Sequence, residues 1–188
     1  MSSGSLAVHS VCEFHEQTNV EPLAEPHVVT ESLERKLSSN KWSDLCEGLL
    51  QFRALVVHHT DEVGERELTK WMPLLLVSLA NLRSAVVKAA LLCVIDILNT
   101  RQLSVAPFIS AEKSSLFHAL LEKSSFEKKF VMSDARRALY LLVDTAPSEV
   151  IITSALLLVK HSRPQFRAQV AFSIAIAVEK SGAHGLQV

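Results

Sequence analysis

With 188 residues, 48% of them apolar and only five Gly, the chain can bury one sizeable core but lacks the turn residues that an all-β fold requires. Lys and Arg total 19 against 20 Asp and Glu, and this balance excludes a global preference for nucleic acid or for anionic membranes. The three Cys residues are widely spaced and form no CxxC pair, so we expect neither a disulfide framework nor a zinc site, and a cytoplasmic location fits best.

Residues 1–29 are expected to form a disordered acidic tail. They contain Glu13, Glu16, Glu21 and Glu25 but no Lys or Arg, and they show no sustained periodicity. The chain start also lacks the basic and apolar regions of a signal peptide, and no apolar run approaches the ~20 residues needed to span a bilayer. We therefore expect one ordered domain over residues 30–188, without a membrane segment.

From Thr30 onward the apolar residues recur at helical spacing. The clearest example is the stripe Leu82, Val86, Ala90, Cys93 and Ile97, which predicts a buried inner helix. The expected helices span, in order, residues 30–38, 42–56, 65–79, 82–97, 110–123, 131–143, 148–160 and 164–180. The fold class predicted from this pattern is all-α.

A bulky apolar residue beside Lys or Arg recurs in four short polar turns. These residues are Trp42, Leu82, Phe130 and Phe166, spaced roughly 40 residues apart, close to the period of about 40–47 residues in HEAT and armadillo arrays. The pattern predicts an α-solenoid of about four helical hairpins that binds another protein.

The turns within the predicted hairpins are basic, whereas the connections between hairpins are acidic in sum. In a stack of hairpins the two sets of loops emerge on opposite edges, so a basic edge is expected to dock an acidic partner. Trp42 is either a core residue that closes the first hairpin or an exposed anchor, since Trp and Arg are favoured hot-spot types. The sequence leaves both possibilities open.

Four segments on these turns, residues 42–50, 81–90, 129–139 and 178–182, resemble TOG domains. These are the tubulin-binding HEAT arrays of the microtubule polymerase and CLASP families, and the likeness is closest to the crescerin group associated with cilia. The resemblance covers residues 30 to about 186. It implies a tubulin or microtubule partner, a cytoskeletal and possibly ciliary location, and tubulin contacts by Lys41, Trp42, Asn81, Arg83, Lys128, Lys129 and Arg163.

The chain departs from the TOG pattern in two ways. Leu45 stands where the family has Lys or Arg three residues after its Trp. The chain also has about four hairpins, whereas a full TOG domain carries further repeats. The resemblance is therefore to a truncated TOG domain. On this basis we expect the apolar flank of the last hairpin, with Ile151, Leu156, Val170 and Ile174, to be partly exposed and covered by a second copy or a partner subunit.

No motif for catalysis or for cofactor binding is present. The sequence contains no GxxxxGK[ST], GxGxxG, GxSxG or HExxH, and the adjacent His58 and His59 lack the spacing of a metal site. Nucleic acid is disfavoured because the basic turns carry no aromatic stacking platform. The alternative function is a generic HEAT or armadillo scaffold that holds a peptide or helix against its broad face, without affinity for tubulin.

Overall fold

The computed structural model describes residues 20–125 and 128–185, with side chains up to residue 182, and these parts contain helices and no strand. The all-α prediction is confirmed. The contacts divide the chain into two units, unit 1 up to Leu103 and unit 2 from Ser104, and each is taken by itself below. A stack of hairpins makes contacts mainly between neighbours and divides readily in this way, so the single domain over 30–188 stays a prediction.

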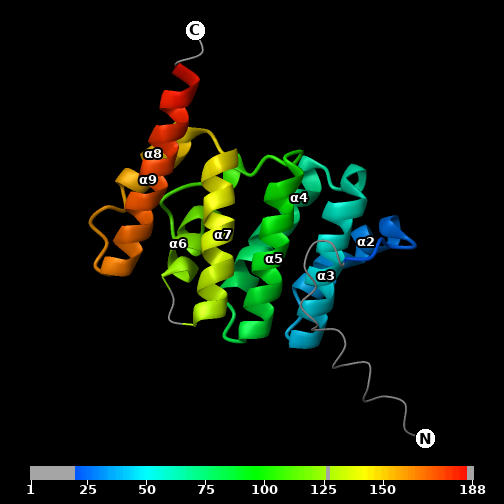
Figure 1. Cartoon of the computed structure of the whole chain (residues 1–188). Helices are drawn as coiled ribbons and strands as arrows, with labels where there is room; N and C mark the ends of the chain where they lie inside the picture. Colours follow the sequence, from blue (N-terminus) through cyan, green and yellow to red (C-terminus); the bar gives the residue numbers. More distant parts are fainter. Residues whose placement is uncertain (1–19, 126–127, 186–188) are drawn as a thin grey trace, which may run out of the picture. The chain divides into compact units, whose positions relative to one another are not determined.

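Unit 1 consists of two helical hairpins (Figure 1). The first pairs α2 (Pro26–Leu37) with α3 (Trp42–His58), and the second pairs α4 (Glu65–Leu79) with α5 (Ser84–Thr100). The second helices of the hairpins, α3 and α5, pack side by side. The Phe52 and Trp71 rings, 5.1 Å apart and edge to face, lie fully inside this core, where each large apolar side chain contributes roughly 1.5–3 kcal/mol by burial.

Unit 2 repeats the arrangement. Its hairpins pair α6 (Leu116–Ser124) with α7 (Lys129–Thr145) and α8 (Ser148–Leu156) with α9 (Pro164–Gly185), and α9 packs against α6 and α7. Phe117, Leu142 and Phe166 are completely buried here. In both units the hairpins therefore stack as in an α-solenoid, and all eight expected helices are present, with the short 3₁₀ turns η2 (Thr60–Glu62) and η3 (Ala106–Phe108) between them.

Residues 20–29, which the sequence analysis assigned to the tail, are placed in the structure as part of unit 1. Val20 is buried, the backbone N–H of Leu23 donates to Nε2 of His59 at 3.0 Å, and the His58 ring bonds the carbonyl of Val20. The helix α2 then starts at Pro26, a residue that suits the first helical position. The remaining tail, residues 1–19, lies outside the described residues.

Leu82 does not belong to the buried stripe of α5. The helix begins at Ser84, and Leu82 is 99% exposed, whereas the other four members of the stripe are buried. The reason is the Asn81 side chain, whose Oδ1 accepts the N–H of Arg83 at 2.9 Å and so closes a turn that competes with helix formation.

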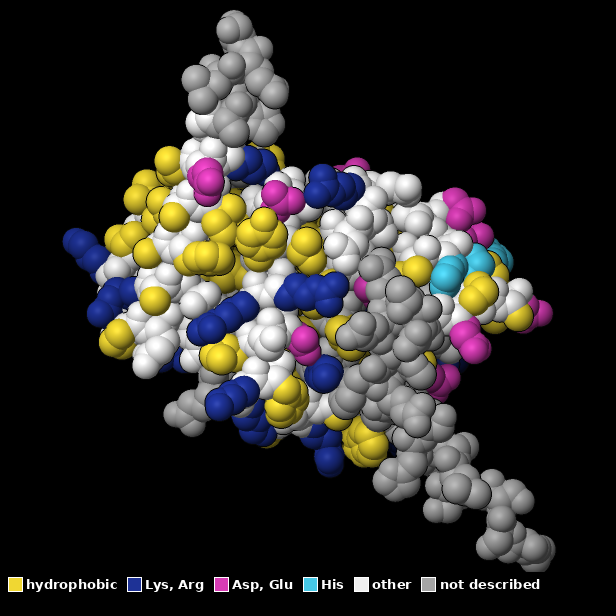
Figure 2. Space-filling view, in the orientation of Figure 1, with side chains coloured by type: hydrophobic (Ala, Val, Ile, Leu, Met, Phe, Trp, Pro, Cys, Tyr) yellow, Lys and Arg dark blue, Asp and Glu magenta, His cyan; other side chains and the backbone are white. Residues whose placement is uncertain are grey.

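The apolar flank of the last hairpin differs from the expectation. Ile151 and Val170 are fully buried, since the packing of α9 against α8, α7 and α6 covers them, and Ile174 is partly exposed. Leu156 is 56% exposed, as expected. Other apolar side chains add to an exposed apolar surface over α7, α8 and α9 (Figure 2), namely Tyr140, Leu157, Val159, Phe172 and Val178.

Among the described residues, none of the helices combines the length and apolar character that crossing a bilayer requires.

Candidate binding edge at the hairpin turns

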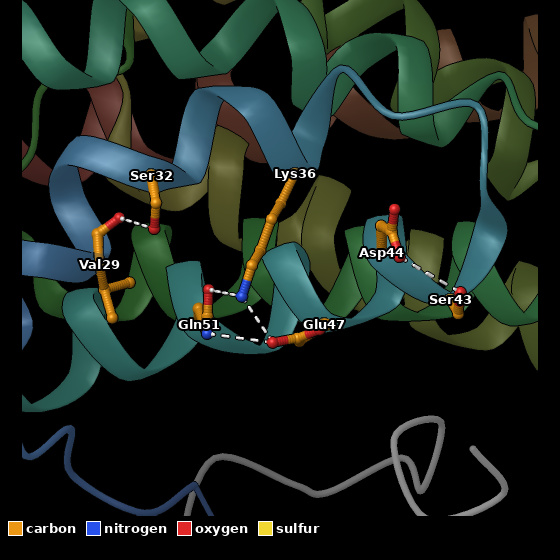
Figure 3. Close-up of polar contacts among 7 residues, drawn as sticks. All are labelled: Val29, Ser32, Lys36, Ser43, Asp44, Glu47 and Gln51. Carbon is orange, nitrogen blue, oxygen red and sulfur yellow. Dashed lines mark hydrogen bonds and ion pairs between the residues drawn. The ribbon is translucent and has the colours of Figure 1, made fainter. Parts of the chain in front are cut away.

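The turn of the first hairpin is fixed by its own side chains. The Ser39 hydroxyl accepts the N–H of Lys41 at 3.1 Å and donates to the Asp44 carboxylate at 2.8 Å, and Ser43 adds a weaker bond to the same carboxylate (Figure 3). Asp44 lies in the first turn of α3, where a negative charge is favoured by the helix dipole. This arrangement sets Trp42 at the start of α3, with Lys41 exposed just before it.

A polar cluster behind this turn joins the two helices of the hairpin (Figure 3). Nζ of Lys36 on α2 lies 2.5 Å from Oε1 of Glu47 and 3.1 Å from Oε1 of Gln51, both on α3. Gly48 lies beside the same contact, and a Cβ placed on it would be 3.0 Å from Cβ of Lys36. The two helices therefore approach closely at this glycine, which holds the turn in a defined position.

The turns of the two hairpins in unit 1 meet through Trp42 and Arg83. Both turns lie at the lower end of unit 1 in Figure 1, and Cζ of Arg83 lies 5.6 Å from the centroid of the Trp42 ring. A cation–π contact at an exposed site contributes about 0.5–1 kcal/mol. Trp42 is half-buried under this contact, so it is neither a core residue nor a fully exposed anchor. The structure thus brings Lys41, Trp42, Asn81 and Arg83 onto one edge.

Leu45 takes no part in this edge. Its side chain is only 9% exposed and belongs to the core of unit 1. Leu45 is therefore a packing residue, and Lys41 and Arg83 are the cations of the described edge in unit 1.

In unit 2 the structure brings Lys128, Lys129 and Arg163 around one hollow of about 610 Å³. Lys128 precedes α7, Lys129 opens it, and Arg163 precedes α9. Arg163 also forms an ion pair of 3.1 Å with Glu122, in which both side chains are about half exposed. Solvent weakens such a pair to about 0–1 kcal/mol, so it orients Arg163 more than it stabilises the fold.

Arg136 lines the same hollow and was missed by the sequence analysis. Its Nε donates to the backbone carbonyl of Ser124 at 3.3 Å. The signal that could have found it is the helical register, since Arg136 follows Lys129 by seven residues and so lies on the same face of α7.

Other chemically active side chains serve the fold. In residues 20–125 and 128–182 we find no group of three or more His, Cys, Asp or Glu that could hold a metal ion, and His58 and His59 bind the backbone of residues 20–23. The Cys46 and Cys93 side chains are buried, and burial, followed by the nearby Asp96 charge, raises the pKa of the Cys93 thiol well above its usual value. A thiol of raised pKa carries little of the reactive thiolate form.

Comparison with known proteins gave one similar protein. No protein-family model matches the chain, and no solved structure matches it. The chain is 26% identical over 142 residues to the TOG array regulator of axonemal microtubules protein 1 of Mus musculus, a match that covers 76% of this chain and 8% of that protein. The chain thus spans less than a tenth of its relative's length.

Proposed function

We propose that the chain is a non-enzymatic binding module that holds tubulin or microtubules through the turns inside its hairpins. We propose that it acts in the cytoskeleton, including the microtubules of the cilium. The printed name of the mouse relative supports a microtubule partner, and the turn residues support the location of the binding surface. In unit 1 these residues are Lys41, Trp42, Asn81 and Arg83, and in unit 2 they are Lys128, Lys129 and Arg163.

The single observation that carries the proposal is the contact between Trp42 and Arg83. Both are of the residue types that dominate protein interfaces, and both remain accessible at the turn. Because the ring holds the guanidinium in place, less side-chain entropy is lost when a partner carboxylate binds it. The exposed Leu82 beside Arg83 offers an apolar contact next to this cation.

The test is co-sedimentation and size-exclusion binding with purified tubulin at low and moderate salt. We compare the wild type with Trp42→Ala and Arg83→Glu, and use Arg66→Glu as the matched control, because Arg66 is an exposed cation of α4 outside the two turns. We expect salt-sensitive binding that both turn variants lose by about tenfold or more and that Arg66→Glu retains. Wild-type protein that binds no tubulin in either salt would refute the proposal.

A second candidate function is a scaffold that holds a peptide or helix against the broad face of the hairpins. It is favoured by Tyr140 on α7 and Phe172 on α9, which are 49% and 47% exposed. Replacing Lys128, Lys129 and Arg163 by Glu would change such binding little, whereas it would weaken binding through the turns. This triple variant therefore separates the two candidates.

A further inference from the structure

We propose that the hollow in unit 2 binds a run of carboxylates, such as a Glu- and Asp-rich segment of a protein partner, and that Arg136 is one of its binding residues. The inference rests on the proposed function for its choice of a protein as the partner. It adds the chemical class of the segment that unit 2 recognises and a residue outside the predicted site.

The lining of the hollow is strongly cationic. Among the described residues that line the hollow, Lys128, Lys129, Arg136 and Arg163 carry a positive charge and none is acidic (Figure 2 shows Lys and Arg side chains over the lower part of α7). The bond from Nε of Arg136 to the Ser124 carbonyl uses one of the five guanidinium donors. Arg163 is oriented by Glu122. Arg136 and Arg163 are thus positioned before any ligand arrives, which lowers the entropic cost of binding.

Lys128, Lys129 and Arg163 lie at the N-terminal ends of α7 and α9, where a positive charge does not stabilise a helix. Neither α7 nor α9 has an acidic residue in its first turn, and Lys128 gives α7 no side-chain cap. The N-terminal end of a helix carries a partial positive charge, so Lys and Arg there are unfavourable by a few tenths of a kcal/mol or more. A bound anion would offset this repulsion, and it would add to the attraction of the four side chains.

The hollow is larger than a single small anion requires. A volume of about 610 Å³ corresponds to on the order of twenty water molecules, much more than one carboxylate or phosphate group occupies. Ser125 and Gln165 add neutral hydrogen-bonding groups to the lining, and Met132 adds an apolar surface. A peptide segment with several carboxylates fits both this mixed lining and the spread of the charges.

The experiment measures binding of a fluorescent ten-residue glutamate peptide to the whole chain by fluorescence anisotropy. The test variant is Arg136→Gln and the matched control is Arg137→Gln, the next residue of the same helix, which is exposed but does not line the hollow. We expect Arg136→Gln to weaken binding by about tenfold, as for the loss of a charge-assisted hydrogen bond. Arg137→Gln should change it by less than about twofold. Circular dichroism checks that both variants are folded.

Three results would overturn the inference. They are a wild type that does not bind the peptide, an equal loss in the two variants, and competition by tripolyphosphate that is as strong as that of the unlabelled peptide at equal charge. The tubulin assay with Trp42→Ala separates the two proposals, because Trp42 belongs to unit 1. Peptide binding without tubulin binding would support the carboxylate-binding role of the hollow and refute the proposed function. Tubulin binding without peptide binding would refute only the role of the hollow.

Discussion

Arg53 of α3 donates from Nε to the Asp96 carboxylate of α5 across 2.6 Å, and the two side chains are only 3% and 1% exposed. The pair joins the second helices of the two hairpins of unit 1. Arg53 lies about three helical turns beyond Trp42, and Asp96 lies a similar distance beyond Arg83. The buried pair therefore fixes the register of α3 against α5, and with it the meeting of Trp42 and Arg83 at the turn.

Removing one partner of this pair should be strongly destabilising. Asp96→Ala leaves a buried guanidinium charge without its carboxylate, and we expect the free energy of unfolding to fall by about 3–5 kcal/mol. Urea denaturation followed by tryptophan fluorescence measures the change. The double variant Arg53→Met with Asp96→Leu should lose much less, because no charge remains buried. If the double variant is as unstable as Asp96→Ala, the pair is not the source of the loss.

Gly48→Ala should destabilise unit 1 although Ala is the better helix former. The added Cβ would lie 3.0 Å from Cβ of Lys36 and 3.3 Å from Cδ2 of Leu37, so α2 must move away from α3. We expect the overpacking to exceed the helical gain and to leave a net loss of about 1 kcal/mol in thermal or urea unfolding.

The control for this substitution is Gly182→Ala on α9, where a Cβ would meet nothing within 4 Å. This change should stabilise the helix by up to about 1 kcal/mol. Equal effects at the two glycines would show that α2 and α3 do not approach closely at Gly48.

The stability of unit 2 should fall as the pH drops below about 6.5. His118 is 4% exposed and its Nδ1 has no hydrogen-bond partner among the described residues. Burial is the main cause that lowers the pKa of His118 below its usual 6.5. The unfolded chain therefore binds a proton at a pH where the folded chain does not, and stability present above pH 6.5 is lost as the pH falls.

We expect His118→Leu to flatten this dependence when urea midpoints at pH 7.5 and 5.5, about one unit on either side of 6.5, are compared. His27→Gln is the control, because His27 is an exposed residue of α2 whose side chain is 76% accessible. A dependence that persists unchanged in His118→Leu would exclude this imidazole as its cause.

Lys180 closes the C-terminal end of α7. Its Nζ donates to the carbonyls of Asp144 and Ala146 at 2.5 and 2.7 Å, where a positive charge is also favoured by the helix dipole. Lys180→Met keeps the apolar stem but removes both bonds, and we expect a loss of about 1.5–3 kcal/mol in the free energy of unfolding. The exposed Lys160→Met should change stability by less than about 0.5 kcal/mol.

The sequence predicts the helices better than it predicts the contacts between them. Helix α4 begins and ends as expected, at Glu65 and Leu79, because its apolar period and its boundaries agree. Helix α6 begins at Leu116, later than expected, since the Ser115 hydroxyl caps it by accepting the N–H of His118 at 3.1 Å. Caps of this kind depend on local geometry that periodicity does not encode.

For the candidate site, too, the sequence predicts the position of residues along the chain but not the contacts between them. Within each unit, the order of the hairpins alone predicts that the turn residues lie at the same end of the helices. The contact between Arg83 and Trp42 depends on how two hairpins stack, and Arg53 and Asp96 stand in apolar helices where a lone charge predicts an exposed position. Only the tertiary partner explains such residues.

The placement of the two tryptophans gives unit 1 its own optical reporter. Both Trp residues of the chain lie in unit 1, Trp71 in its core and Trp42 at its turn, whereas the single Tyr, Tyr140, lies in unit 2. Tryptophan emission therefore follows the melting of unit 1, and the far-ultraviolet signal follows the helices of both units. Coincident transitions would show cooperative unfolding of the whole chain, and separated transitions would give each unit a stability of its own.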